Sequence, residues 1–169
     1  VTTLVLTEEK DNRPVTERIK TFEDAVKATG ITLPFDDNQL SYMPKDVVAY
    51  MKLRIIAAAL NELTEDTLDE FPKLTTVEYR WYPWFYFYTQ EYIDNMYEEK
   101  KKNLWRLGGY SINGSNCCLA YANSNFAWSY SYSNVSARLA VKSEELAKYF
   151  GQQFIEIWSD YVALPSKDD

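Results

Sequence analysis

Residues 79 to 88 read Tyr79-Arg80-Trp81-Tyr82-Pro83-Trp84-Phe85-Tyr86-Phe87-Tyr88, and eight of these ten side chains are aromatic. Aromatic residues favour β-strands, and successive side chains of a strand point to opposite faces. If the alternation continues through Pro83, one face carries Tyr79, Trp81, Phe85 and Phe87, and the other carries Arg80, Tyr82, Trp84, Tyr86 and Tyr88. Proline cannot donate to a β-ladder, so Pro83 indicates an edge position or a bulge. A bulge at Pro83 would exchange the two faces in the second half of the strand.

The two faces predict different environments. We expect the first face to pack under helices as core. The second face is a candidate binding surface, because an antiparallel sheet needs only one buried face and the polar tips of Tyr and Trp tolerate water. A later alternating stretch, NFAWSYSYS at 125–133, adds a further aromatic side chain to this surface. The candidate binding residues are Arg80, Tyr82, Trp84, Tyr86, Tyr88 and Trp128.

Downstream segments predict the rest of an antiparallel sheet. Residues 105–112 and 116–122 flank Asn113-Gly114, which is a strong hairpin signal. Residues 125–133 and 137–142 also alternate as strands do. We therefore expect about four aromatic-rich strands.

Helical patterns surround this sheet. Thr21 and Gly30 mark the start and end of one helix, and Pro44 fits the first turn of a longer helix over 41–63. Residues 31–39 read as a loop. Ser143 caps a long C-terminal helix whose apolar stripe is Leu146, Phe150, Phe154, Ile157, Trp158 and Tyr161.

Residues 89–104 return to helical spacing between two strands and are expected to form a solvent-facing helical insertion. The fold class is thus α+β, with N-terminal helices, the sheet and a long C-terminal helix packed on it. No linker or repeat divides the chain, so 1–169 is expected to be a single globular domain.

Composition argues against several functions. The chain has 169 residues, a net charge of −7 and a pI of about 4.7, which argues against duplex DNA as a partner. It contains no histidine, the commonest general base and transition-metal ligand. The two cysteines, Cys117 and Cys118, are adjacent and do not have metal-ligand spacing. We expect no catalytic residues, no metal and no cofactor, and the sequence has no apolar run long enough for a membrane span.

Carboxylates are the one catalytic possibility left open by the composition. Two of them at the correct separation could act as a glycosidase pair or bind a hard cation. The alternative, which we favour, is that they are solvated acids at helix ends and loops. They are Asp36, Asp37, Glu65, Asp66, Asp69 and Glu70.

Four stretches together resemble a family of small uncharacterised proteins of phages and prophages of gut bacteria. They are VTERIKTFEDAVKATG (15–30), DVVAYMKLRIIAAALNE (46–62), YRWYPWF (79–85) and SARLAVKSEELAKYFGQQFIEIWSDYV (136–162). The family pattern has a YYPWF-like strand and a GSRLxxKSxELAxYxGxQF strand-to-helix segment, which this chain follows apart from the opening glycine. The resemblance implies a phage or mobile-element origin and a location in the bacterial cytoplasm or the virion, but no specific activity.

These observations favour a non-enzymatic binding or assembly protein whose partner is another protein or a second copy of the chain. Two alternatives stay open. One is a single-stranded nucleic-acid-binding protein that stacks bases on the aromatic sheet face. The other is a carboxylate-based glycan hydrolase.

Overall fold

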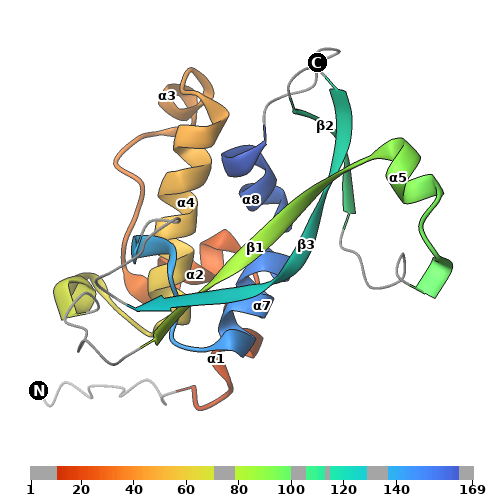
Figure 1. Cartoon of the computed structure of the whole chain (residues 1–169). Coiled ribbons are helices and arrows are strands. Elements are labelled where there is room, and N and C mark those ends of the chain that lie inside the picture. Colours follow the sequence, from red (N-terminus) through yellow and green to blue (C-terminus); the bar gives the residue numbers. More distant parts are fainter. Residues whose placement is uncertain (1–10, 71–78, 100–105, 113–114, 129–136, 164–169) are drawn as a thin grey trace, which may run out of the picture.

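A computed structural model of the chain describes residues 11–70, 79–99, 106–112, 115–128 and 137–163. The fold is a mixture of helices and strands (Figure 1). The larger helices lie together at the left of Figure 1, two long strands cross in front of them, and a short helix lies beyond the far end of the first strand. Residues 2–7, whose sequence TTLVLT is typical of a short strand, lie outside the described residues.

The N-terminal helices begin and end at local capping signals. They are α1 (Val15–Arg18), α2 (Phe22–Thr29) and α3 (Asp37–Ser41). The hydroxyl of Thr21 accepts from the backbone of Asp24, and Gly30 ends α2 in the left-handed region at φ 74°, as the sequence predicts. Residues 37–41 were expected to be loop or the start of the next helix. They form α3 because Asp36 and Gln39 make a reciprocal capping box.

Helix α4 (Lys45–Leu60) lies at the centre of the core. Its side chains Leu53, Ile56 and Leu60 are fully buried. The helix packs against α2 on one side and against the last helix of the chain, α8 (Ile155–Val162), on another. Burial on several sides explains why its apolar residues cover a wide arc rather than a narrow stripe. A short 3₁₀ helix, η1 (Glu65–Glu70), follows it.

Three strands form an antiparallel sheet in the described part of the chain. They are β1 (Tyr79–Thr89), β2 (Arg106–Ile112) and β3 (Ser115–Trp128), in the order β1-β3-β2, so β1 is an edge strand. Ile112 stands opposite Ser115, as the Asn113-Gly114 hairpin signal predicts. The segments predicted as separate strands at 116–122 and 125–133 are one strand as far as Trp128, and residues 129–133 lie outside the described part.

A bulge interrupts the pairing of β1 with β3, but not at Pro83. Trp84 stands opposite Asn123 and Phe85 opposite Tyr121, so the extra residue, Ala122, belongs to β3. Because the inserted residue is in the partner strand, β1 keeps its own alternation of faces. The face pattern read through Pro83 therefore holds.

The strand expected at 137–142 does not join the sheet as a fourth strand. Residues Ala137–Leu139 form a 3₁₀ turn, η2, and only Val141 pairs with β1, through two backbone hydrogen bonds with Trp81 of 2.9 and 2.8 Å. In an antiparallel ladder the next donor on this edge of β1 would come from residue 83. Residue 83 is proline, so the ladder cannot continue.

A buried asparagine holds the same segment against α4 instead. The Nδ2 of Asn61 donates to the carbonyl of Ala140 at 2.9 Å, and its Oδ1 accepts from the backbone N–H of Lys142 at 3.0 Å. Asn61 is 1% exposed. Its amide thus satisfies two backbone groups on the edge of this segment that faces away from β1.

The expected long C-terminal helix is two helices. Ser143 caps α7 (Glu144–Gln153) as predicted, but Phe154, at φ −109° and ψ 27°, separates α7 from α8. The ring of Phe154 is buried and makes edge contacts with Tyr149 and Phe150. The break lets α7 pack on β1 and β3 while α8 packs on α4 and β2.

The helix expected over 89–104 is also shorter in the described residues. It is α5 (Gln90–Asp94), which lies beyond the end of β1 and away from the other helices (Figure 1). The side chain of Asn95 donates to the carbonyl of Glu91 at 2.9 Å. The backbone N–H of Asn95 donates to the same carbonyl at 3.2 Å, so Asn95 caps the last turn of the helix.

Candidate binding surface

The inner face of β1 packs on the core at two of the four residues predicted to do so. Trp81 and Phe85 are half-buried against the main apolar cluster, and the ring of Phe85 lies 5.3 Å from that of Trp158. Tyr79, expected on the same face, is 41% exposed because it lies at the start of the strand. The side chain of Phe87 is not among those described.

The outer face is covered along its first half. Tyr82 is only 7% exposed, and Trp84 is half-buried with its ring 6.5 Å from that of Tyr82. Arg80 is half-buried too, and its Nη1 donates to the carbonyl of Tyr79 at 3.1 Å. These three predicted binding residues therefore do not form an open platform.

The second half of the outer face is open and carries three adjacent tyrosines, which we name the tyrosine row: Tyr86, Tyr88 and Tyr92. The rings of Tyr88 and Tyr92 are parallel within 4° at a centroid distance of 5.0 Å. Tyr86 lies 5.9 Å from Tyr88. Tyr86 is 49% exposed and Tyr92 is 56% exposed. The row is therefore ordered by ring contacts and still accessible to a partner.

Helix α5 positions Tyr92. The hydroxyl of Thr89, the last residue of β1, accepts from the backbone N–H of Tyr92 at 3.2 Å and starts the helix. Ile93 is 1% exposed and anchors the helix to the sheet, so its neighbour Tyr92 is turned outward. Tyr92 was absent from the predicted site; the signal for it was its spacing of four residues from Tyr88 across a Thr cap.

The ionisation of Tyr88 reflects this arrangement. Burial raises the pKa of the Tyr88 hydroxyl above its ordinary value, and the neighbouring hydroxyls of Tyr92 and Tyr86 raise it further. The Tyr88 hydroxyl is therefore uncharged at neutral pH.

Trp128 does not belong to the row. Its backbone stands opposite Tyr79, whereas Tyr88 stands opposite Cys118. Nine residues of strand separate the two positions, which is about 30 Å along β1. The six predicted residues thus fall into three groups: the exposed Tyr86 with the half-buried Tyr88, the covered Tyr82 and Trp84 with Arg80, and Trp128 at the opposite end of the strand.

The charges beside the tyrosine row are acidic. Between Trp84 and Glu99 the chain carries four acids and no basic residue, and all four acids are exposed. One of them, Glu91, directly precedes Tyr92. The lysines at 100–102 lie outside the described residues. The four acids are Glu91, Asp94, Glu98 and Glu99.

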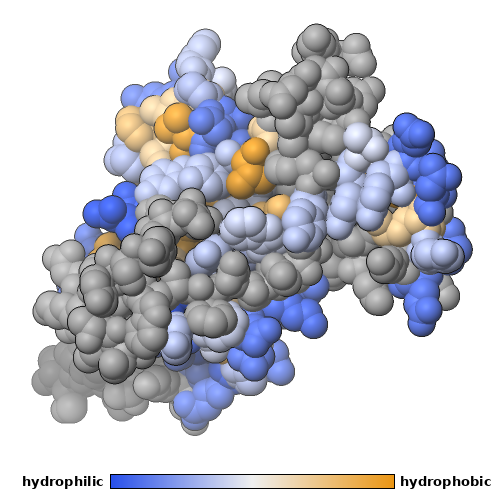
Figure 2. All heavy atoms as spheres, viewed as in Figure 1, coloured by the Kyte–Doolittle hydropathy of each residue, from blue (hydrophilic) through white to orange (hydrophobic). Residues whose placement is uncertain are grey.

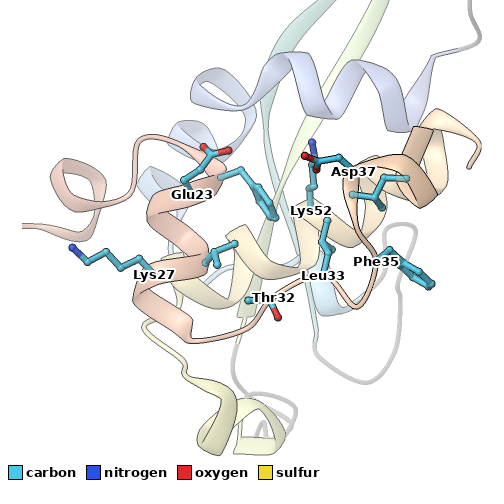
Figure 3. A pocket seen from close by; sticks show the side chains of 10 residues that line it. Glu23, Lys27, Thr32, Leu33, Phe35, Asp37 and Lys52 are labelled. Carbon is cyan, nitrogen blue, oxygen red and sulfur yellow. The ribbon is translucent and has the colours of Figure 1, made fainter. Parts of the chain in front are cut away.

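A separate cavity of about 430 Å³ lies between α2, α3, α4 and the loop that joins α2 to α3 (Figure 3). Within it, the Nζ of Lys52 lies 5.4 Å from the centre of the Phe22 ring. The charged lining consists of two acids and two lysines, so no single charge dominates. The lining residues are Phe22, Glu23, Val26, Lys27, Thr32, Leu33, Phe35, Asp37, Leu40 and Lys52.

Hydrophobic surface is found near this cavity rather than at the tyrosine row. Figure 2 shows orange surface over α3 and the start of α4, where Phe35 and Val47 are partly exposed. The surface over α5, at the right of Figure 2, is mostly hydrophilic. The tyrosine row is thus aromatic without being strongly apolar, because each ring carries a hydroxyl.

The described residues contain no group of three or more His, Cys, Asp or Glu side chains that could hold a metal ion. Among the same residues, no helix combines the length and hydrophobicity that a membrane span requires. No family model, curated protein or solved structure matches this chain. The candidate surface is therefore argued from its own geometry.

Proposed function

We propose that this chain is a non-enzymatic binding or assembly protein that associates with another protein, or with copies of itself, through the tyrosine row. The proposal is carried by one observation: Tyr88 contacts the rings of both Tyr86 and Tyr92, and those two outer rings stand exposed at the end of the sheet that is farthest from the helical cluster.

Tyrosine suits such a role for a physical reason. Its ring supplies a large contact area with only two side-chain torsions to immobilise, and its hydroxyl can bond to polar groups of a partner. In this chain Tyr86 and Tyr88 are held by the pairing of β1 with β3, and Tyr92 by the Thr89 cap. A surface ordered before binding loses little conformational entropy when a partner docks.

The acidic charge next to Tyr92 argues against the single-stranded nucleic-acid alternative. Single-strand binders surround their stacking residues with basic groups. The exposed carboxylate of Glu91, which directly precedes Tyr92, would repel phosphates instead. We therefore favour a protein partner, and the hydrolase alternative stays a prediction.

The biological setting proposed from the family resemblance is a phage or prophage protein of the bacterial cytoplasm or the virion. The neighbouring genes test this part of the proposal. Phage replication or virion genes on both sides would support it, and a cluster of host metabolic genes would count against it.

The binding role is tested by a pair of matched variants. Tyr86→Ser/Tyr92→Ser removes two exposed rings from the row, and Tyr42→Ser removes an 84% exposed ring at the end of α3 as the control. Oligomeric state is measured by size-exclusion chromatography with light scattering over a range of micromolar concentrations. Proteins that co-purify from the native host are quantified in parallel.

We expect the double variant to lose either an oligomer or a co-purifying protein that the wild type and Tyr42→Ser both retain. Circular dichroism establishes that the double variant is folded. If all three proteins show the same oligomeric state and the same co-purifying proteins, the tyrosine row is not a binding surface and the proposal is wrong.

A further inference from the structure

The tyrosine row has two properties that together narrow the class of its partner. The first is an aromatic ring that is partly open to solvent. Tyr88 and Tyr92 lie parallel at 5.0 Å, and the high exposure of Tyr92 leaves part of its ring open to solvent. The face of an aromatic ring carries negative electrostatic potential, which attracts a cation placed over it.

The second property is an acidic side chain next to the row in the sequence. Glu91 is exposed and immediately precedes Tyr92. Carboxylates near an aromatic face add Coulomb attraction for a cation and repel an anion. The Tyr92 ring and the Glu91 carboxylate therefore both favour a positively charged group in a partner.

We propose that the tyrosine row receives arginine or lysine side chains of a basic protein segment. This inference rests on the proposed function, since it names the partner of the same surface. Arginine is the better fit of the two, because its planar guanidinium stacks on an aromatic ring while its N–H groups donate to a carboxylate. Glu91 is the carboxylate best placed in the sequence to accept from a group that lies on Tyr92.

The test uses the full chain and three probes of equal length: a glycine-arginine repeat peptide, a glycine-glutamine repeat peptide and an oligothymidylate. Binding is measured by isothermal titration calorimetry at low and at physiological salt. We expect the arginine peptide to bind, with affinity falling as salt rises, and the other two probes not to bind.

Substitutions at one position separate a cation on a ring from simple apolar contact. Tyr92→Phe keeps the aromatic face and should keep the affinity for the arginine peptide within about two-fold, whereas Tyr92→Leu keeps apolar bulk and should weaken it about three- to five-fold. Glu91→Gln should also weaken it. Glu145→Gln makes the same charge change at an exposed position on α7 and should leave the affinity unchanged.

Equal weakening by Glu91→Gln and Glu145→Gln would mean that the peptide binds the acidic protein non-specifically, and would overturn the inference. Full affinity of Tyr92→Leu for the arginine peptide would also overturn the inference. If the wild type binds oligothymidylate and Tyr92→Leu does not, the partner of the row is a nucleic acid and the inference of a basic protein segment is wrong. If the arginine peptide does not bind but Tyr86→Ser/Tyr92→Ser still loses an oligomer or a protein partner, the proposed function stands and only the basic partner is wrong.

Discussion

The outer face of β1 has two contrasting halves. In the first half Tyr82 is buried and Trp84 is half-buried. In the second half Tyr86 is exposed, Tyr88 is half-buried, and the exposed Tyr92 of α5 extends the face. The residue types are nearly the same in both halves, so composition does not explain the difference. The halves differ in their surroundings: the first is bridged to Val141, and the second leads to α5, away from the helical cluster.

This contrast shows that an aromatic strand can serve as core and as surface within ten residues. Side chains under water-excluding neighbours contribute stability, while the same kind of side chain without cover is available for binding. The comparison therefore predicts that substitutions beneath β1 change stability and that substitutions in the tyrosine row do not.

The largest effect is expected under the inner face, at Trp158. This residue is 1% exposed and contacts the rings of Phe85 and Phe150 at 5.3 and 5.0 Å. Trp158→Ala should reduce the free energy of unfolding by about 3–5 kcal/mol, because it leaves a large cavity. Chemical denaturation measures the change. Trp158→Phe is the control: it keeps most of the ring and removes an indole N–H that has no hydrogen-bond partner among the described residues, so it should cost much less. Equal losses in the two variants would contradict the packing account.

The next effect concerns the segment that bridges to the first half of β1. Asn61→Ala would leave the buried carbonyl of Ala140 and the partly buried N–H of Lys142 without their partner. We expect a loss of about 2–4 kcal/mol, since each unsatisfied buried group is costly. Asn61→Asp should keep the acceptor for Lys142 and lose the donor to Ala140. A loss below about 0.5 kcal/mol in Asn61→Ala would show that water replaces both bonds.

The sharpest comparison uses two adjacent residues on opposite faces. Phe85 packs on the core, and Tyr86 is 49% exposed. Phe85→Ala should cost about 2–3 kcal/mol because the ring is half-buried, while Tyr86→Ala should cost less than about 1 kcal/mol. Thermal and urea denaturation of the pair measure the difference. If Tyr86→Ala were the more destabilising substitution, the assignment of faces would be wrong.

The smallest effect is expected in the ionisation of the Tyr88 hydroxyl. Folding raises the pKa of Tyr88 through burial and through its neighbours Tyr92 and Tyr86. The neutral form is therefore favoured in the fold, so this stabilisation is present at neutral pH and is lost as pH rises through the raised pKa. We expect the tyrosinate absorbance of wild type minus Tyr88→Phe to titrate above the ordinary value of about 10. A difference curve at or below that value would contradict the contacts in the row.

Much of this fold could be predicted because its signals are local. Thr21, Gly30, Ser143 and the Asn113-Gly114 hairpin each act through neighbouring backbone atoms, and the alternation of β1 faces is a property of one strand. The missing fourth strand depended on two distant residues, Pro83 and Asn61, which meet residues 140–142 only in the folded chain. The break at Phe154 likewise arises from packing rather than from a helix-stop signal.

The candidate site could be predicted only in part for the same reason. The alternation of the sequence predicts which residues share the outer face. It does not predict how exposed each side chain is, because that depends on the elements that cover each half of the strand. Tyr82 and Trp84 are covered, and Trp128 is at the far end of the strand. Tyr92 joins the row because the Thr89 cap starts a helix that places its ring beside that of Tyr88. The alternation of side chains within β1 does not predict this contact, since Tyr92 lies beyond the strand.

Pro83 has a consequence for the behaviour of this protein in concentrated solution. An aromatic edge strand is a template for pairing with a second molecule and so for aggregation. By withholding one donor from the outer edge of β1, Pro83 interrupts any ladder that another chain could build there, just as it stops the ladder with Val141. We therefore expect Pro83 to limit edge-to-edge association of β1, in the middle of an aromatic segment.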